Sequence, residues 1–458
     1  MKNGKSRIVG LLAFVAFSNC IAAAGLENCA MYLATDVDFL ARNISEVEMA
    51  SAAMDCEQWM EVVPIQSVSE GQPTNGLPSY LSAPYENAGL VSNYIKTVDN
   101  DWVPRDSYDL SGAFNVYVLS KNSDTAYWHP VNRVIVLGKG KTDFQNLSAD
   151  LDTLSHEFLH ALMTANGSAP LTTEGRAIGE SLSDFFAAAV SRHYNRQNVW
   201  EISEQSFVDR PGDFALRYLS NPTRSSFNYG SASAPLKMRD HFGEAYSGTG
   251  DQGGRHVNSG FVSLALYLMS EGGLHPRADY HGDFSHLTIS STEKIGLENV
   301  ARLLRYMIET RQTNIRNFGF SGFKKELVDA SRSILNRTGQ AYTDANRTAI
   351  CKAFAQVGIA DAASECAPYV TLPQKPANPA NVTIQRDYCY GSNTLSWSAV
   401  SGATKYKVFL DNGALVANTS ELETTLDVPY AGYVTLKACN VTCSSGVKKM
   451  AQYYSGCR

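Results

Sequence analysis

A chain of 458 residues is too long for one small hydrophobic core and predicts two to four structural units. With 44% hydrophobic and 18% charged residues, its composition is that of an ordinary globular protein. The formal net charge of -6 argues against nucleic acid as a partner, because proteins that bind it electrostatically are usually basic.

The N-terminus has the pattern of a signal peptide. Basic residues precede the apolar run IVGLLAFVAF, and Ala22 and Ala24 supply the small residues of a cleavage site. The run is too short to span a bilayer, so we expect residues 1–24 to be removed and the protein to be secreted without stable membrane insertion. A lipoprotein signal at Cys20 is the alternative, although the preceding FSN fits it poorly.

Beyond the predicted signal peptide, the chain divides into regions with different patterns of apolar and polar residues. Residues 25–150 contain β-rich runs such as AFNVYVLS and predict a β-rich lobe. Residues 151–367 repeat apolar residues at three- and four-residue intervals and predict a helical lobe. Residues 368–381 include LPQKPANPAN, which predicts an extended linker. Residues 382–458 consist of short alternating runs and predict an all-β sandwich.

Eight of the nine cysteines follow the signal peptide, and an even number in an exported chain indicates disulfides. The sequence does not fix their connectivity. Proximity along the chain favours the pairs Cys29–Cys56, Cys351–Cys366 and Cys439–Cys443, which leaves Cys389 with Cys457.

The run TLSHEFLHALM, residues 153–163, carries the chemistry of greatest interest. Residues four apart lie on one helix face, so His156 and His160 can present two imidazoles to one metal ion. Glu157 lies beside them, where a carboxylate can take a proton from attacking water. The alternative is a core helix with a hydrogen-bonded histidine pair.

A catalytic zinc ion needs a third protein ligand and an open fourth position. The downstream run EGRAIGESLSDFF offers Glu180 on a second predicted helix, from which its carboxylate could reach the ion. Asp184 follows on the same face and could accept a hydrogen bond from the outer nitrogen of His156 or His160. The alternative is that both acidic residues only solvate a helix face.

Taken together, these motifs resemble the thermolysin-like zinc metalloproteases, over residues 86 to 362. The resemblance rests on HEFLH followed by GRAIGESLSD, on TAYWHPVNRVIVLGKG, on FALRYLSNP, on DQGGRHVNSG and on DANRTAICKAFAQVGI. It implies a two-lobed α+β fold, with a β-rich N-terminal lobe, a helical C-terminal lobe and the zinc site at the lobe junction. LSWSAVSGATKYKVFLDNG similarly resembles a fibronectin type III module, which implies such a sandwich after the linker.

The resemblance also implies roles for individual residues. Zinc is held by His156, His160 and Glu180, with Glu157 as the general base. His256, oriented by Asp251, stabilises the oxyanion. The substrate-binding residues implied are Ala126 on an edge strand, Arg217 at the substrate carbonyl, and Phe144, Leu147, Ile202 and Leu216 around the first primed side chain. That pocket predicts a hydrophobic residue after the scissile bond; core packing is the alternative for its members.

The sequence departs from the family at several positions. Leu171 stands where a tyrosine usually assists the oxyanion, and Thr125 where an asparagine usually contacts substrate, with Asn122 nearby. The matching calcium ligands are Asp152, Glu201 and Glu204, but Ser191 and Val199 replace two further carboxylates. We therefore expect a single Ca²⁺ site at most, since calcium prefers six or more oxygens. Residues 25–85 are too short for the family's long propeptide; a reduced propeptide and unaided folding both remain open.

The leading hypothesis is a secreted zinc-dependent endopeptidase that acts on protein or peptide substrates and carries a C-terminal β-sandwich. The alternative is a catalytically impaired, zinc-bearing adhesion or binding protein that acts through that sandwich. Leu171 and Thr125 favour the alternative, whereas Glu157 and His256 oppose it. A zinc enzyme that acts on another amide or ester is a third interpretation. Within the sandwich, four aromatic residues could stack on a ligand or form the core: Tyr388, Tyr390, Trp397 and Tyr406.

Overall fold

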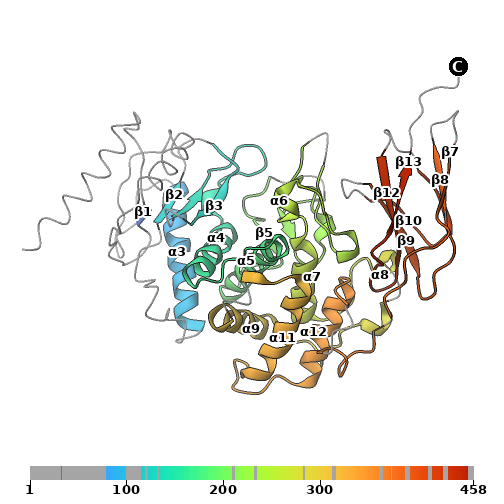
Figure 1. Ribbon diagram of the computed structural model, residues 1–458. Coiled ribbons are helices and arrows are strands. Elements are labelled where there is room, and N and C mark those ends of the chain that lie inside the picture. The colour runs from blue at the N-terminus through green and yellow to red at the C-terminus, as the bar shows by residue number, and fades with distance from the viewer. Residues whose placement is uncertain are drawn as a thin grey trace, which may run out of the picture. The chain divides into compact units, whose positions relative to one another are not determined.

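The computed structural model describes most of the chain from residue 79 onward (Figure 1). The described residues are 32–33, 79–98, 115–118, 122–130, 134–208, 212–231, 235–281, 284–311, 316–360, 365–372, 374–386, 392–410, 415–426 and 432–451. The predicted signal peptide lies outside them. No helix in these ranges is both long and apolar enough to cross a bilayer.

The chain divides into two compact units. The first comprises residues 1–166 and 186–215, and the second comprises residues 167–185 and 216–458. The helix α5 (Thr173–His193) contributes to both, with its first part in the second unit and its last part in the first. In this division residues 186–215 belong with the N-terminal part of the chain, and the domain boundaries expected from the sequence stay predictions.

The first unit is built around a four-stranded mixed sheet of order β1-β2-β4-β3. Its strands are β1 (Tyr32–Leu33), β2 (Asn115–Val118), β3 (Ala126–His129) and β4 (Val134–Leu137). Strand β4 pairs parallel with β2 and antiparallel with β3, and its four residues VIVL are all buried. A central strand covered on both faces needs such an uninterrupted apolar run.

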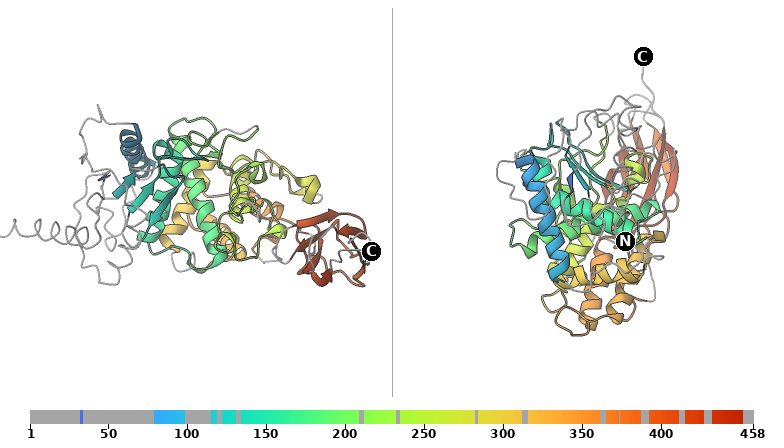
Figure 2. Two further views of the ribbon diagram at one scale, coloured as in Figure 1. Left: turned by 90° about the horizontal axis from the view of Figure 1, so that it is seen from above. Right: turned by 90° about the vertical axis from the view of Figure 1, so that its left-hand side faces the viewer.

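Helices cover this sheet and account for much of the first unit. The helix α4 (Leu151–Ala165) packs on β3 and β4, and α3 (Ser79–Val98) packs on α4 beside β2 (Figure 2). The 3-10 helix η2 (Leu147–Ala149) leads into α4, and the short strand β5 (Glu201–Ile202) follows α5. The helix α3 lies within residues 25–150, for which a β-rich lobe is predicted.

The second unit contains the helical segment predicted from the apolar periodicity. Its central helix α7 (Ser259–Glu271) is buried on almost every side and packs on α9 (Leu297–Thr310) and α12 (Asp344–Gln356). A helix that is apolar all round is expected at such a central position. The remaining elements are β6 (Arg217–Tyr218), η3 (Pro222–Arg224), η4 (Phe242–Glu244), α6 (Asp251–Gly254), α8 (Ala278–His281), η5 (Ser285–Leu287) and α11 (Phe320–Ser333).

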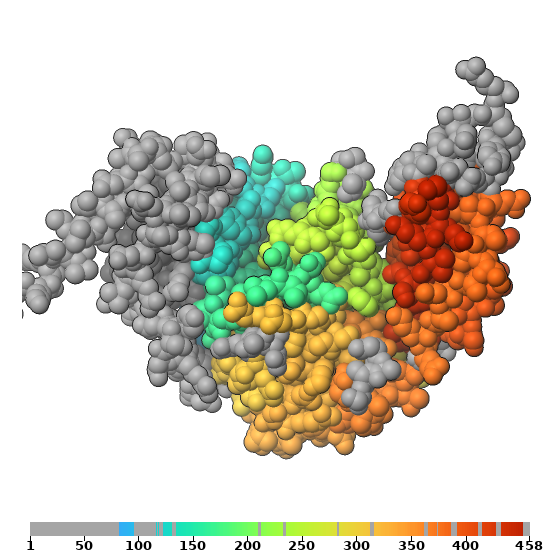
Figure 3. All heavy atoms as spheres, in the orientation of Figure 1, coloured from blue at the N-terminus to red at the C-terminus, as the bar shows by residue number. Residues whose placement is uncertain are grey.

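The C-terminal part of the second unit consists of two antiparallel sheets. One has the order β10-β9-β12-β13 and the other β11-β8-β7. Their strands are β7 (Thr383–Arg386), β8 (Asn393–Ser396), β9 (Lys405–Leu410), β10 (Leu415–Thr419), β11 (Glu423–Leu426), β12 (Gly432–Cys439) and β13 (Val447–Ala451). In the space-filling view, the sandwich atoms, orange to red, adjoin the helical segment of the same unit (Figure 3).

The described aromatic residues of the sandwich were expected either to stack on a ligand or to form its core. Trp397 and Tyr406 are buried among Leu395, Val408 and Leu436, with their ring centroids 5.2 Å apart. These two residues therefore form core and do not offer a stacking surface to a ligand. Tyr388 and Tyr390 lie outside the described residues.

Two of the four expected disulfides are present and confirm the pairing by proximity. Cys351 is bonded to Cys366 after α12, and Cys439 to Cys443 at the end of β12. The predicted Cys29–Cys56 and Cys389–Cys457 pairs lie outside the described residues.

Candidate metal centre and catalytic site

The helix α4 of the first unit carries His156, Glu157 and His160. The helix begins where the Asp150 side chain accepts the backbone N–H of Thr153 at 2.9 Å, which caps one of its free donors. His156 and Glu157 are buried, and His160 is half-buried. The four-residue spacing therefore places two imidazoles on one face of a well-anchored helix.

The geometry of these two imidazoles fits a metal ion. The Nε2 atoms of His156 and His160 lie 3.2 Å apart, and the rings are inclined at 81°. Two nitrogens each about 2.0–2.1 Å from a tetrahedral zinc ion would lie roughly 3.3 Å apart. The pair thus has the separation that two ligands of one ion require.

The strand β3, which carries Ala126, is the last strand of the sheet. The indole Nε1 of Trp128 on this strand donates to Thr164 at the end of α4 at 3.1 Å, which connects the strand to the helix that carries His156 and His160. Thr125 directly precedes β3, and its carbonyl accepts the backbone N–H of Gly138. An edge strand of this kind can pair with an extended peptide.

A further residue before β3 escaped the sequence analysis. The carboxylate of Asp124 accepts four backbone N–H groups from residues 141–144 at 2.6, 2.8, 3.1 and 3.2 Å. It thereby fixes the turn that leads to Phe144. No sequence signal identifies this partner, because the contact joins segments about 20 residues apart.

The four predicted pocket residues are divided between the units. Phe144, Leu147 and Ile202 are buried in the first unit, where Phe144 packs edge-to-face on Phe207 at 5.6 Å. Leu216 is half-buried in the second unit. Their burial is compatible both with a position in the wall of a substrate pocket and with core packing. The preference for a hydrophobic residue after the scissile bond therefore stays a prediction.

Two of the acidic residues expected to bind calcium, Asp152 and Glu204, lie in one carboxyl cluster with Asp150. Burial, followed by the charges of Asp150 and Glu204, raises the pKa of Asp152 well above its ordinary value. Burial also raises the pKa of Glu204, and the hydroxyl of Ser191 donates to Asp152 at 2.5 Å. These shifts favour retained protons, which a calcium ion would have to displace. Glu201 is half-buried on β5. The carboxyl groups of the cluster therefore do not support calcium binding, and the calcium site stays a prediction.

In the second unit, Glu180 and Asp184 are fully buried on α5 and paired with cations. The guanidinium of Arg217 lies 3.0 Å from Asp184 and 4.0 Å from Glu180. Burial alone would lower the pKa of Arg217, but its anionic neighbours, Asp184 foremost, raise it above the ordinary value. Asp184 therefore anchors Arg217; its predicted bond to His156 or His160 stays a prediction.

Glu180 has a second cationic partner that the sequence analysis missed. The Nε atom of Arg255 donates to Glu180 Oε1 at 2.5 Å, and a terminal nitrogen of the same guanidinium contacts this oxygen too. The only sequence signal is the position of Arg255 directly before His256 in DQGGRHVNSG. Because Glu180 is buried, this bond fixes the orientation of its carboxylate.

His256 follows a left-handed stretch of backbone. Asp251, Gln252, Gly253 and Gly254 have φ values of 50°, 51°, 86° and 87°, and glycine adopts such values without a Cβ penalty. This turn folds Asp251 back onto His256. The Oδ2 of Asp251 accepts the backbone N–H groups of His256 and Val257 at 2.7 and 2.9 Å.

Tyr229 is a further neighbour of His256 that the sequence analysis did not name. Its ring stacks on the imidazole with centroids 5.3 Å apart and an interplanar angle of 13°. Burial raises the pKa of Tyr229, so the phenol stays neutral. Leu171, at the position where the resemblance implies a tyrosine, is 56% exposed.

Comparison with known proteins identifies a family similarity over part of the chain. Residues 171–359 match the family described as thermolysin metallopeptidase, alpha-helical domain. The matched residues, most of which belong to the second unit, therefore form a helical domain of thermolysin type, which confirms that part of the resemblance.

Individual relatives match longer or equally similar parts of the chain. The chain is 30% identical over 274 residues to thermostable neutral protease NprT of Geobacillus stearothermophilus, covering 59% of this chain and 44% of the relative. It is 34% identical over 194 residues to bacillolysin of Brevibacillus brevis, covering 42% of this chain and 33% of the relative. The chain thus spans less than half the length of these relatives.

Among solved structures, the precursor of protealysin, a metalloproteinase from Serratia proteamaculans, matches with a TM-score of 0.49 and 18% identity. The match covers 63% of this chain and 81% of that structure.

Proposed function

We propose that the protein is a secreted zinc-dependent endopeptidase that prefers a hydrophobic residue after the scissile bond. The observation that supports it most strongly is the 3.2 Å separation of the two Nε2 atoms on α4. His156 and His160, with Glu180, constitute a candidate metal-ligand group. Two neutral nitrogens and one carboxylate are a ligand set that catalytic zinc sites use.

Individual residues then have separate roles in hydrolysis. Zinc, when bound, would act as a Lewis acid toward water and the peptide carbonyl. Glu157 accepts the proton of the attacking water and passes it to the leaving amine. His256, with Nδ1 held by Asp251, donates from Nε2 toward the carbonyl oxygen as negative charge develops there.

Substrate positioning is assigned to the edge strand and to Arg217. An extended peptide would pair with β3 next to Ala126, and Arg217 would hold a carbonyl on the primed side. The ion pair with Asp184 supports this role, because it fixes the guanidinium of a side chain that is only 7% exposed. Phe144, Leu147, Ile202 and Leu216 would line the apolar pocket for the first primed residue.

The protein is proposed to be exported and to carry a fibronectin type III-like C-terminal domain. The basic and apolar pattern of residues 1–24 supports secretion. The two antiparallel sheets of residues 382–458 support a fibronectin type III-like sandwich.

Chelation and reconstitution test the proposed activity. Purified protein should cleave casein, lose this activity when a chelator removes its metal, and regain it with stoichiometric zinc. A zinc-free preparation that cleaves equally well would contradict the proposal. So would a fully zinc-loaded preparation without hydrolysis, which would favour the binding-protein hypothesis.

A further inference from the structure

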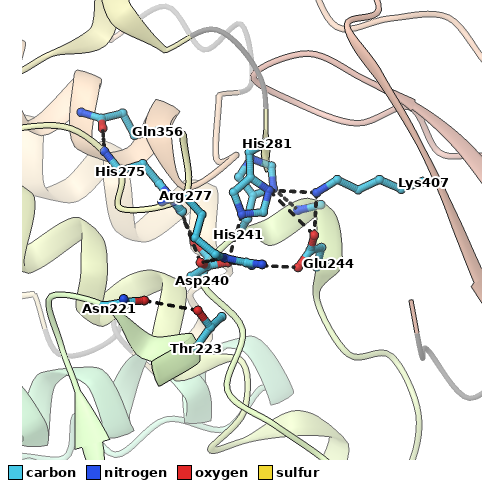
Figure 4. Close-up of polar contacts among 11 residues, drawn as sticks. Asn221, Thr223, Asp240, His241, Glu244, His275, Arg277, His281, Gln356 and Lys407 are labelled. Carbon is cyan, nitrogen blue, oxygen red and sulfur yellow. Dashed lines mark hydrogen bonds and ion pairs between the residues drawn. The ribbon is translucent and has the colours of Figure 1, made fainter. Parts of the chain in front are cut away.

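A buried polar network joins the β-sandwich to the helical segment of the second unit (Figure 4). Strand β9 points Tyr406 and Val408 into the sandwich core, so Lys407 lies on its opposite face. Although that face lies outside the sandwich core, the side chain of Lys407 is 0% exposed. The helical segment must therefore cover it.

Lys407 completes a closed ring of five side chains. Its Nζ donates to Glu244 Oε1 at 2.7 Å and to His281 Nδ1 at 2.9 Å. His281 Nε2 lies 3.1 Å from Asp240, which accepts Arg277 Nε at 2.5 Å. Arg277 returns to Glu244 at 3.3 Å and closes the ring. The sandwich supplies only Lys407, and the helical segment supplies the other four members.

The hydrogen bonds define the protonation of the ring. Because Lys407 donates to Nδ1 of His281, the imidazole proton must lie on Nε2, where it is donated to Asp240. Burial alone would raise the pKa of Asp240, but Arg277 and His281 hold it well below its ordinary value. Burial lowers the pKa of His281, which keeps its imidazole neutral.

A metal ion does not fit this network, although Asp240, His275 and His281 have ligand atoms within 4.8 Å of one another. His275 Nε2 lies 3.0 Å from the carbonyl oxygen of Asp240, and its Nδ1 accepts the N–H of Arg277 at 3.0 Å. Both nitrogens of His281 are engaged as well. Arg277 already provides the cation that faces the Asp240 carboxylate.

Other contacts show that the sandwich fits closely against the helical segment. Val441 belongs to a buried apolar cluster with Phe284 and Leu287. Asn418 on β10 donates to the carbonyl of Tyr280 at 3.1 Å. A Cβ atom on Gly243 would lie 2.5 Å from the sulfur of Cys443, so only glycine fits there.

The ring also connects to the segment that carries the catalytic histidine. Asp240 and Glu244 belong to residues 239–246, whose two ends bind residues 257–258. The N–H of Arg239 donates to the Val257 carbonyl at 2.8 Å. The N–H of Tyr246 donates to Asn258 Oδ1 at 2.8 Å, and Asn258 Nδ2 returns a bond to the Tyr246 carbonyl at 2.9 Å.

We infer that Lys407 of the sandwich is a positioning residue for the His256 segment. By closing the ring, it fixes residues 239–246, which in turn hold residues 251–258. The sandwich is then an integral support of the helical segment and not a tethered module. Only the effect on catalysis rests on the proposed function, because the physical coupling exists with or without hydrolysis.

Hydrogen–deuterium exchange of the full chain tests this coupling without any substrate. Lys407→Met removes the ammonium and keeps the length of the side chain, and Lys405→Met on the same strand is the matched control. In Lys407→Met, amides of residues 239–246 and 251–258 should exchange at least about tenfold faster, since loss of one partner of a buried ion pair is strongly destabilising. Exchange equal to that of Lys405→Met would overturn the inference.

A second variant and a kinetic readout complete the test. Glu244→Gln keeps an acceptor for Lys407 but loses the charge, so it should give the same pattern to a smaller extent even if Lys407→Met fails to fold. Unchanged exchange in folded Glu244→Gln would count against the inference. With zinc-loaded protein, folded Lys407→Met should lower kcat on a peptide substrate with little change in KM. If even the unaltered protein lacks activity, the proposed function fails while the exchange result still decides the coupling.

Discussion

The imidazole of His256 is held by the carboxylate of Asp251, with Nδ1 2.5 Å from Oδ1. The other oxygen of Asp251 binds two backbone N–H groups of the same turn. One carboxylate therefore fixes both the backbone and the ring of the residue assigned to the oxyanion. A carboxylate in this position accepts the Nδ1 proton and so fixes the orientation of the ring.

Asp251→Asn should lower kcat/KM by roughly 10–100-fold, the range expected when an orienting partner is lost. The amide can still accept from Nδ1 but does not balance a positive imidazole. Steady-state kinetics on a fluorogenic peptide would measure the effect, and bound zinc should stay at the wild-type level. A variant with unchanged kinetics would remove Asp251 as the orienting partner of His256.

Glu180→Gln should weaken zinc binding by more than about 100-fold. Loss of a group that only orients a metal ligand costs roughly 10–100-fold in affinity, and loss of a ligand should cost more. The neutral amide is a poorer ligand, and the substitution also removes the charge that Arg255 and Arg217 face. Competition with a chromophoric chelator would give the affinity. Glu298→Gln, which breaks a surface ion pair with Arg337, is the matched control. Equal affinities in both variants would exclude Glu180 as a ligand.

The buried carboxyls of the first unit should make its stability depend on pH. The folded pKa of Asp152 lies above its ordinary 3.8, so the folded state binds the proton more tightly than the unfolded state. This stability is present below about pH 4 and is lost as pH rises through the folded pKa, at up to about 1.4 kcal/mol per pH unit. Chemical denaturation with a chelator present should therefore show a flatter pH profile for Asp152→Asn. Parallel profiles would mean that Asp152 is ionised in the folded protein.

Local sequence patterns predicted the elements whose residues are near one another in the chain. The four-residue spacing of His156 and His160 requires their shared helix face, and the apolar run of α7 requires a buried helix. The Cys351–Cys366 and Cys439–Cys443 pairs follow from short separations. The family match over residues 171–359 confirms the helical domain that the motifs indicated.

Contacts between distant segments were not predictable in the same way. Lys407 and Glu244 are 163 residues apart, and a lysine on a strand is normally solvated. The bond between Arg255 and Glu180 spans 75 residues, and no spacing rule connects them. The helix α3 was not predicted, because the sequence analysis singled out only the β-rich runs within the mixed stretch of residues 25–150.

The measurement that tests the central claim most directly is casein hydrolysis by Glu157→Gln with its zinc content determined. The substitution preserves the size of the side chain, but the resulting amide cannot accept the proton of attacking water. The account predicts full zinc occupancy through His156 and His160 and a loss of kcat of at least about 100-fold, the lower bound for general-base catalysis. Full occupancy with wild-type hydrolysis would contradict it.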